Sequence, residues 1–196
     1  MTRHRTALAG SEPTAVLDGG RRVPITLRRA EILALLVSRT QGWSAEELAY
    51  RLHGDDGAAS TVRTEMHRIR AVIGAVVEPN PYRFASGVRV VSDADVVVGH
   101  LRAGRLGEAL AAYPARLLNR STNLSVELMR DDLNEAVAAS VRSSGNAEVI
   151  SQWCASDMGS GDIAAAAALA RLTGPGDPRF HVVRARMDRI DRELRA

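Results

Sequence analysis

Apolar and polar positions recur with helical spacing between Ser60 and Gly74, and this stretch organises our interpretation of the chain. At about 100° per residue the apolar side chains fall on one narrow stripe. The stripe comprises Val62, Met66, Ile69 and Ile73, with Val72 beside it. The opposite arc carries small, hydroxyl-bearing and cationic side chains, namely Ser60, Arg63, Thr64, His67, Arg68 and Ala71, with Arg70 at the margin. The pattern predicts an amphipathic helix with a buried face and a polar face.

Two further helices are predicted before this stretch. Apolar residues keep helical spacing over residues 27–39, and Gln41-Gly42 ends that helix. Ser44 and Glu47 form a capping-box pattern, which predicts a second helix over residues 45–52. The connection at residues 53–57 combines His53 with two adjacent Asp residues; a metal site would need more ligands, so we interpret it as a polar turn.

Strand patterns lie on both sides of these helices. Residues 15–26 predict a hairpin with a turn at residues 18–20, and Pro24 places its second strand at a sheet edge. Residues 82–84 and 88–91 flank Ala85-Ser86-Gly87 and predict a second hairpin. Residues 1–13 are expected to form a flexible polar tail.

The predicted order is therefore hairpin, three helices and hairpin, over residues 14–91. A winged helix-turn-helix has this order: its third helix enters the major groove of DNA, and its final hairpin forms the wing. The connector between the second and third predicted helices is longer than a simple three-residue turn. The order of these five elements indicates a winged helix-turn-helix more specifically than any single element does.

Residues 92–196 predict an all-helical domain. Ser92 to Asp95 form a helix start, and Gly104, Pro114, Gly145 and Gly161 separate successive helical patterns. The later helices are predicted over residues 123–142, 147–155, 163–172 and 178–194. Short helices joined by Gly and Pro turns suggest a TPR-like arrangement, although no clean repeat consensus is found. The predicted fold class is mainly α with small β hairpins.

Charge and composition limit the function. All 26 basic residues are Arg, and the net charge is +3. Residues 1–92 hold 13 Arg against 9 acids, and residues 93–196 hold 13 Arg against 14 acids, so the positive excess lies in the N-terminal half. The single Cys154 excludes an intramolecular disulfide, and no apolar run is long enough to span a bilayer. These features predict a cytoplasmic protein without a membrane partner.

Enzyme motifs were not found in the sequence. It has no G-x-S-x-G, no phosphate-binding loop and no G-x-G-x-x-G, and its five His residues are isolated. Cys154 follows Trp153 and is interpreted as a buried small hydrophobe. We therefore predict no catalytic residue, no cofactor and no metal site.

The chain resembles a known group of regulators. Residues 23–91 are similar to OmpR/PhoB winged-helix domains, in which the third helix carries Val62, Met66, Ile69, Arg70 and Ile73 at the matching places. Leu27 to Leu33, Ser44 to Ala49, Thr61 to Arg70 and Pro81 to Phe84 resemble the C-terminal region of actinobacterial GAF-domain-containing transcriptional regulators. Residues 93–143 are similar to the bacterial transcriptional activator domain. The GAF sensor expected upstream is not in this sequence, which leaves a ligand response open.

The resemblance and the helix pattern together imply binding of double-stranded DNA. Arg63, Thr64, His67 and Arg68 are expected to read the major groove, and Ser60, Thr61 and Arg70 to contact phosphates. Arg83 and Arg89 are expected to approach the backbone or minor groove from the wing. RNA polymerase or a sensor domain are the expected protein partners. One helix reads few base pairs, so a homodimer or tandem binding is expected.

Two alternatives stay open at this point. The polar arc of residues 60–74 also fits a helix face that meets only water. The chain also fits a protein-protein interaction module, a helical adaptor whose winged helix does not bind DNA.

Overall fold

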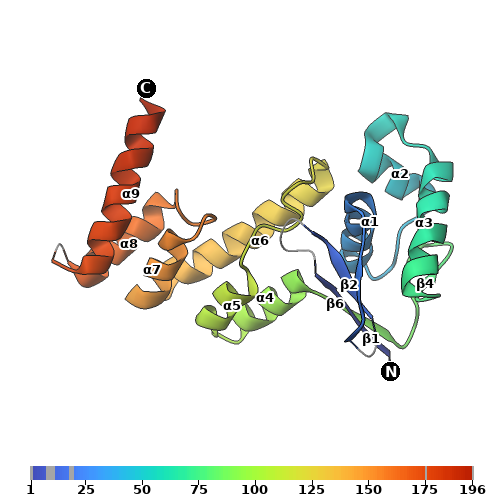
Figure 1. Cartoon of the computed structure of the whole chain (residues 1–196), viewed down its shortest axis with the longest axis horizontal. Coiled ribbons are helices and arrows are strands. Elements are labelled where there is room, and N and C mark those ends of the chain that lie inside the picture. The colour runs from blue at the N-terminus through green and yellow to red at the C-terminus, as the bar shows by residue number, and fades with distance from the viewer. Residues whose placement is uncertain (1, 8–11, 18–19, 175, 196) are drawn as a thin grey trace. The chain divides into compact units, whose positions relative to one another are not determined.

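The computed structural model describes residues 2–7, 12–17, 20–174 and 176–195. Within these ranges, the side chains of residues 2–7, Arg89, Arg186, Ile190, Asp191, Glu193 and Leu194 are not described. The elements in chain order (Figure 1) are β1 Thr2–Ala7, β2 Thr14–Val16, β3 Arg22–Pro24, α1 Leu27–Ser38, α2 Ala45–His53, the 3₁₀ turn η2 Gly54–Asp56, α3 Ala59–Ile73, β4 Val77–Glu78, β5 Arg83–Phe84, β6 Val88–Ser92, α4 Asp93–Arg102, α5 Leu106–Ala112, α6 Leu124–Ser143, α7 Ala147–Ala155, α8 Ile163–Thr173 and α9 Pro178–Leu194.

The helices confirm the periodicity argument. Helix α2 begins with the predicted capping box: the Glu47 amide donates to Ser44 Oγ over 3.0 Å, and the Ser44 amide donates to Glu47 Oε2 over 2.8 Å. This bond and the Arg39 guanidinium hold the pKa of Glu47 below its usual value. Helix α9 begins after Asp177, with Pro178 in its first turn, where a missing N–H is tolerated. Among the described residues, none of the helices could serve as a membrane span.

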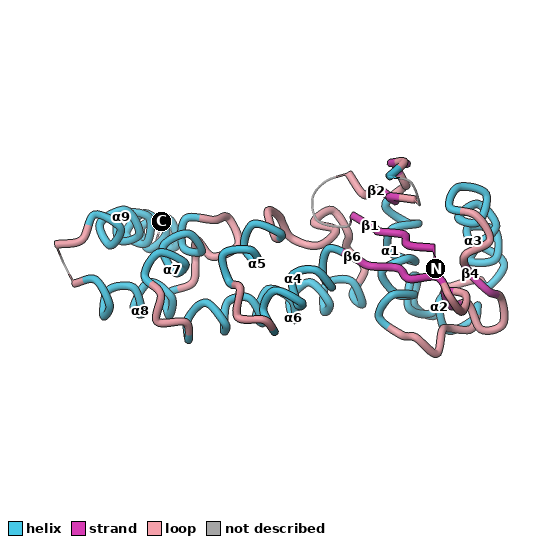
Figure 2. Tube along the Cα trace, turned by 90° about the horizontal axis from the view of Figure 1, so that it is seen from below, coloured by secondary structure: helices cyan, strands magenta, loops and turns pink. Residues whose placement is uncertain are grey.

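A four-stranded sheet of order β3-β2-β1-β6 lies at the N-terminal end of the chain. The predicted hairpin is confirmed as β2 with β3, and Pro24 lies in the edge strand β3; of its turn, Asp18 and Gly19 lie outside the described residues. The expected flexible tail is corrected in part, because residues 2–7 form β1. This strand runs antiparallel to β2 and parallel to β6, and Figure 2 shows β1 beside β6.

The second predicted hairpin is wrong in its pairing, although both strands exist. Strand β5 pairs with β4, in register Val77↔Phe84 and Glu78↔Arg83, whereas β6 pairs with β1. The Pro79-Asn80-Pro81 turn reverses the chain, so that β5 pairs with β4. Strand β5 therefore already has a partner when the chain reaches Gly87 and β6. Tyr82 extends the pairing to Trp43: the Trp43 amide donates to the Tyr82 carbonyl over 3.0 Å, and the Tyr82 amide donates back over 2.8 Å.

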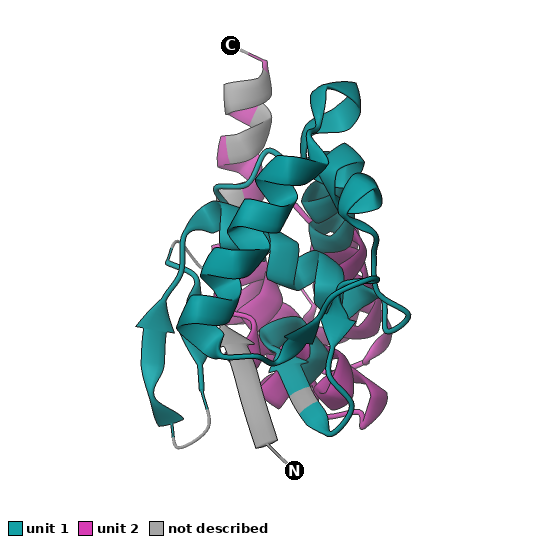
Figure 3. Ribbon diagram, turned by 90° about the vertical axis from the view of Figure 1, so that its right-hand side faces the viewer, with its two compact units in different colours: residues 1–96, 116–131 teal, residues 97–115, 132–196 magenta. Residues whose placement is uncertain are grey.

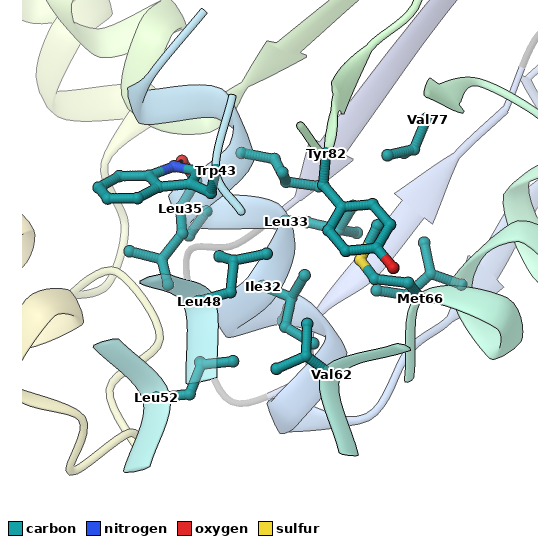
Figure 4. Packing of buried hydrophobic residues seen from close by; sticks show 14 of the residues in the cluster. Ile32, Leu33, Leu35, Trp43, Leu48, Leu52, Val62, Met66, Val77 and Tyr82 are labelled. Atoms are coloured by element: carbon teal, nitrogen blue, oxygen red, sulfur yellow. Dashed lines mark hydrogen bonds between the residues drawn. The ribbon is translucent and has the colours of Figure 1, made fainter. Parts of the chain in front are cut away.

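One hydrophobic core joins α1, α2, α3 and the β4–β5 pair. Ile32 and Leu33 from α1, Leu48 from α2 and Met66 from α3 are almost fully buried. Figure 4 shows Tyr82, Met66 and Val77 among the labelled residues of this core. The buried stripe of α3 is therefore held by the two preceding helices and the following strands.

The chain divides into two compact units (Figure 3), whose bounds differ from the predicted division at residues 91/92, and the predicted domains stay a prediction. Unit 1 comprises residues 1–96 and 116–131, and unit 2 comprises residues 97–115 and 132–196. Leu117, Leu118 and Val126 belong to the same core as α1, α2 and α3. The sequence pattern missed this because a helical pattern does not show which core its apolar face joins.

Unit 2 is helical in its described residues. Helix α7 packs against α8 and α9, and Trp153 from α7 is buried. The Trp153 indole N–H donates to Asp162 Oδ2 over 3.0 Å, while Asp162 Oδ1 accepts from the Ala165 amide and caps α8. Arg142 donates to the same carboxylate over 3.0 Å. Cys154 is buried, as predicted. The successive helices agree with the helical, TPR-like character expected.

Candidate nucleic-acid interface

Helix α3 separates its two faces as the sequence predicted. Val62, Met66 and Ile69 are at most 1% exposed, and Ile73 is also buried. The side chains of the opposite arc are exposed: Ser60, Thr61, Arg63, Thr64, His67, Arg68 and Ala71. The packing of the buried stripe fixes the rotation of α3, so this arc must face outward.

The N-terminus of α3 suits a phosphate group. Its first turn contains no acidic residue, and the cap position is Ala58, whose side chain cannot satisfy the free amides. Exposed helix amides and the helix dipole favour an anion there. Ser60 and Thr61 add two exposed hydroxyl groups at this end. The Thr64 hydroxyl donates to the Ser60 carbonyl over 3.0 Å, which leaves its oxygen able to accept.

Two arginines of the exposed arc are held by carboxylates. Arg63 Nη2 lies 2.8 Å from Glu46 Oε1 on α2. Arg68 pairs with Glu65, which also accepts from Arg29 Nε of α1 over 3.1 Å. Burial opposes the charged form of Glu65, but the hydrogen bonds from Arg29 and Arg68 outweigh it and keep the pKa of Glu65 below its usual value. Both arginines are therefore paired with carboxylates in the free protein.

These surface pairs do not prevent binding of a polyanion. Arg63 and Arg68 are 58% and 55% exposed, and exposed ion pairs contribute about 0–1 kcal/mol. A bidentate contact with guanine is worth about 1–3 kcal/mol of discrimination against the wrong base. Exchange of the carboxylate for another acceptor therefore costs little.

Arg70 lies at the margin of the exposed arc, as the sequence pattern indicated, and its phosphate role stays a prediction. Its Nε donates to the Val77 carbonyl over 2.9 Å, and its guanidinium lies 5.7 Å from the centroid of the Tyr82 ring. It is half-buried between α3 and the β4–β5 pair. In this geometry Arg70 connects α3 to β4.

The two predicted wing residues, Arg83 and Arg89, lie on different strands. Arg83 lies on β5, is 47% exposed and pairs through Nε with Glu78 Oε2 over 3.0 Å. Because β5 pairs with β4, the strand pair beside α3 is β4–β5 and not the predicted 82–91 hairpin. Arg89 lies on β6 opposite Arg3 of β1, and its side chain is outside the described residues.

Trp43 is a structural residue near this surface that the sequence analysis did not single out. It lies between α1 and α2, donates its indole N–H to the Leu35 carbonyl over 2.7 Å, and forms the bridge to Tyr82. The guanidinium groups of Arg39 and Arg51 lie 4.6 and 5.5 Å from its ring centroid. A Trp directly before a capping Ser was the available signal, because a large residue there can pack onto the helix it precedes.

Comparison with known proteins gives a partial match. The family model described as YTH3-like protein, third C-terminal helical domain, matches residues 146–196. The uncharacterized 47.3 kDa protein in the thcA 5′ region of Rhodococcus erythropolis is 32% identical over 198 residues, which cover 98% of this chain and 44% of that protein. The chain thus spans less than half the length of this curated relative.

A solved structure shares the fold. EmbR of Mycobacterium tuberculosis, determined in complex with a low affinity phosphopeptide, matches with a TM-score of 0.54 and 16% identity. The match covers 98% of this chain and 66% of the EmbR chain. The likeness supports a mainly helical chain with small strand pairs, as predicted.

Proposed function

We propose that the chain is a sequence-specific, double-stranded DNA-binding transcriptional regulator. Helix α3 would lie in the major groove, with Arg63, Thr64, His67 and Arg68 toward base edges. Ser60, Thr61 and the amides at the start of α3 would hold phosphates, and Arg83 would approach the backbone from β5. The protein would act in the cytoplasm without a cofactor.

One observation carries this proposal. The stripe formed by Val62, Met66, Ile69 and Ile73 is clamped in the core, while the arc that bears Arg63 and Arg68 is exposed. A helix of this kind presents cationic and hydroxyl groups at fixed positions on a firm support. Such groups match the acceptors of the major groove and its flanking phosphates.

The proposal also includes protein partners. EmbR was solved in complex with a phosphopeptide, so the proposal includes a protein partner for this chain. A link to GAF-domain regulators rests on the sequence resemblance. RNA polymerase or a sensor domain remain the partners that this resemblance implies, and a homodimer would supply a second α3.

Selection of bound duplexes from a random pool tests the function. The proposal expects an enriched motif that contains guanines, with a spacing between half-sites if the protein binds as a dimer. It also expects duplex affinity to fall steeply with salt, because each phosphate contact contributes about 0.9 to the slope of log affinity against log salt. A pool that shows no enrichment and no retention at low salt would contradict the proposal.

A protein-interaction module is the second candidate. Unit 2 exposes large apolar side chains on α8 and α9: Ile163 is 70% exposed and Val182 is 67% exposed. Tyr50, Leu124 and Leu128 of unit 1 are exposed as well, so both units offer apolar groups that a partner could contact. Partner capture that persists without any duplex binding at low salt would favour this candidate.

A further inference from the structure

The exposed large apolar side chains of unit 1 gather at one place. In the described part of this unit they are Tyr50, Leu124 and Leu128, and each is more than half exposed. Tyr50 and Leu124 line the same hollow of about 430 Å³, between the end of α2 and the start of α6. Leu128 lies one turn further along α6. Single exposed apolar residues are ordinary, but a group of them indicates an interaction surface.

An acidic side chain continues the outer face of α6 beyond these leucines. At about 100° per residue, Leu124, Leu128 and Asp131 lie within about 60° of one another, and all three are exposed. Arg130 points away from them, because its Nε donates to the Leu117 carbonyl over 2.8 Å. Helix α6 as a whole holds four acids and two Arg. We call Leu124, Leu128 and Asp131 the α6 stripe.

Helix α9 carries a stripe of similar order and opposite charge. Val182, Ala185 and Arg189 are exposed and also lie within about 60° of one another on their helix. Val183 lies on the inner side of α9 and is buried, which fixes this rotation. The helix holds five Arg and three acids. We call Val182, Ala185 and Arg189 the α9 stripe.

The two stripes also agree in spacing. On α6, Asp131 follows Leu124 by seven positions. On α9, Arg189 follows Val182 by the same interval. Seven residues are about two helical turns, the repeat at which parallel helices pack side by side. A parallel pair of these helices would therefore place apolar residues beside apolar residues and the carboxylate beside the guanidinium.

A second copy of the chain can supply the partner of each stripe. Both stripes are exposed within the single chain, so they do not cover each other there. We propose that the α6 stripe of one protomer binds the α9 stripe of a second copy, and that the reciprocal contact closes a dimer. Burial of the apolar residues favours the contact, and the opposite charges set its direction and register. The contact occurs twice in such a dimer.

This inference deepens the proposed function, on which it rests for the use of a second α3. The contact itself involves no DNA, so it is tested without DNA. If wild type binds duplex but stays monomeric, the inference fails and the proposed function stands. If wild type dimerises through the two stripes but retains no duplex at low salt, the proposed function fails and the contact stands.

The experiment measures the mass of the whole chain by light scattering after size-exclusion chromatography, over about 1 to 100 µM. We expect wild type to be dimeric at the upper end of this range. Leu128→Glu should raise the dimer dissociation constant at least about tenfold, because a charge replaces an apolar side chain in both contacts. Ile163→Glu is the matched control, since Ile163 is exposed on α8 and belongs to neither stripe. It should dimerise as wild type does.

Charge reversal identifies the partner surface. Asp131→Arg and Arg189→Asp should each raise the dissociation constant about tenfold, since each places like charges opposite one another in both contacts. The double variant restores the pair in reverse and should return to within about threefold of wild type.

Three results would overturn the inference. Wild type could remain monomeric at about 100 µM, the single variants could dimerise as wild type does, or the double variant could be no better than either single one. If Arg189→Asp weakens duplex binding and leaves the dimer unchanged, α9 contacts DNA and the inference is overturned as well.

Discussion

The Ser121 hydroxyl donates to Glu31 Oε1 over 2.6 Å, and both side chains are buried although 90 residues separate them in the chain. The carboxylate of Glu31 also lies 2.8 Å from Arg28 Nη1. Asn123, two residues after Ser121, donates to the Arg51 carbonyl over 2.8 Å. This bond connects the same segment to the end of α2. Residues 116–131 are thereby part of unit 1.

Removal of the Ser121 hydroxyl should destabilise unit 1. Ser121→Ala leaves a buried carboxylate oxygen without its donor, which costs about 1–3 kcal/mol in the free energy of unfolding. Urea unfolding measures the change. Ser86→Ala, at an exposed position between β5 and β6, should change stability by less than about 0.5 kcal/mol. Equal values for the two variants would contradict the role assigned to Ser121.

Arg70 should behave as a structural residue and not as a phosphate contact. Arg70→Ala removes the bond to the Val77 carbonyl and the contact with the Tyr82 ring, and should lower the free energy of unfolding by about 1–3 kcal/mol. The salt slope of duplex binding, measured where the variant is folded, should stay at the wild-type value. A salt slope that falls by about 0.9 in Arg70→Ala would instead show that Arg70 contacts a phosphate.

Substitution of Gly42 by Ala should destabilise the protein by more than its positive φ alone would. Its φ is +84°, and an added Cβ would lie 2.6 Å from the Tyr82 carbonyl oxygen. Gly104 has a φ of +70°, and the same Cβ would meet no described atom within 4 Å. Both changes to Ala incur the cost of a left-handed conformation, about 1 kcal/mol. Thermal unfolding should show the larger loss for Gly42→Ala, and equal losses would contradict a close approach.

Asp177 should contribute to the acid sensitivity of unit 2. Hydrogen bonds from the Arg179 side chain and amide lower its pKa to about 2. A carboxyl whose pKa falls on folding stabilises the protein above its unfolded pKa and loses that effect as pH falls through the folded value. The melting temperatures of wild type and Asp177→Asn should therefore differ most near neutral pH and converge between about pH 4 and pH 2. A difference that is constant with pH would contradict this.

The helices and the exposed arc of α3 were predictable from sequence, because each is set by local periodicity and caps. Ser44 and Glu47 mark the start of α2 whatever surrounds it, and Val62, Met66 and Ile69 fix the rotation of α3. These signals involve residues within a few positions of one another.

The strand partners and the unit boundary were not predictable by the same means. The pairing of Thr2 with Val88 and the bond from Ser121 to Glu31 join residues far apart in sequence. The local pattern at residues 82–91 does not show that β5 pairs with Val77–Glu78 and not with β6. The pairing of Arg63 with Glu46 was missed for the same reason, since it depends on how α2 and α3 cross.

The most direct test of the central claim is the affinity of Arg63→Ala and Arg68→Ala for a selected duplex, measured by fluorescence anisotropy at fixed salt. The interface assigned to α3 predicts that each loses about 1–3 kcal/mol of binding free energy and relaxes preference at one base pair. Arg171→Ala, exposed on α8, should bind as wild type does. If both α3 variants also bind as tightly as wild type, the exposed arc of α3 is not the DNA-binding surface.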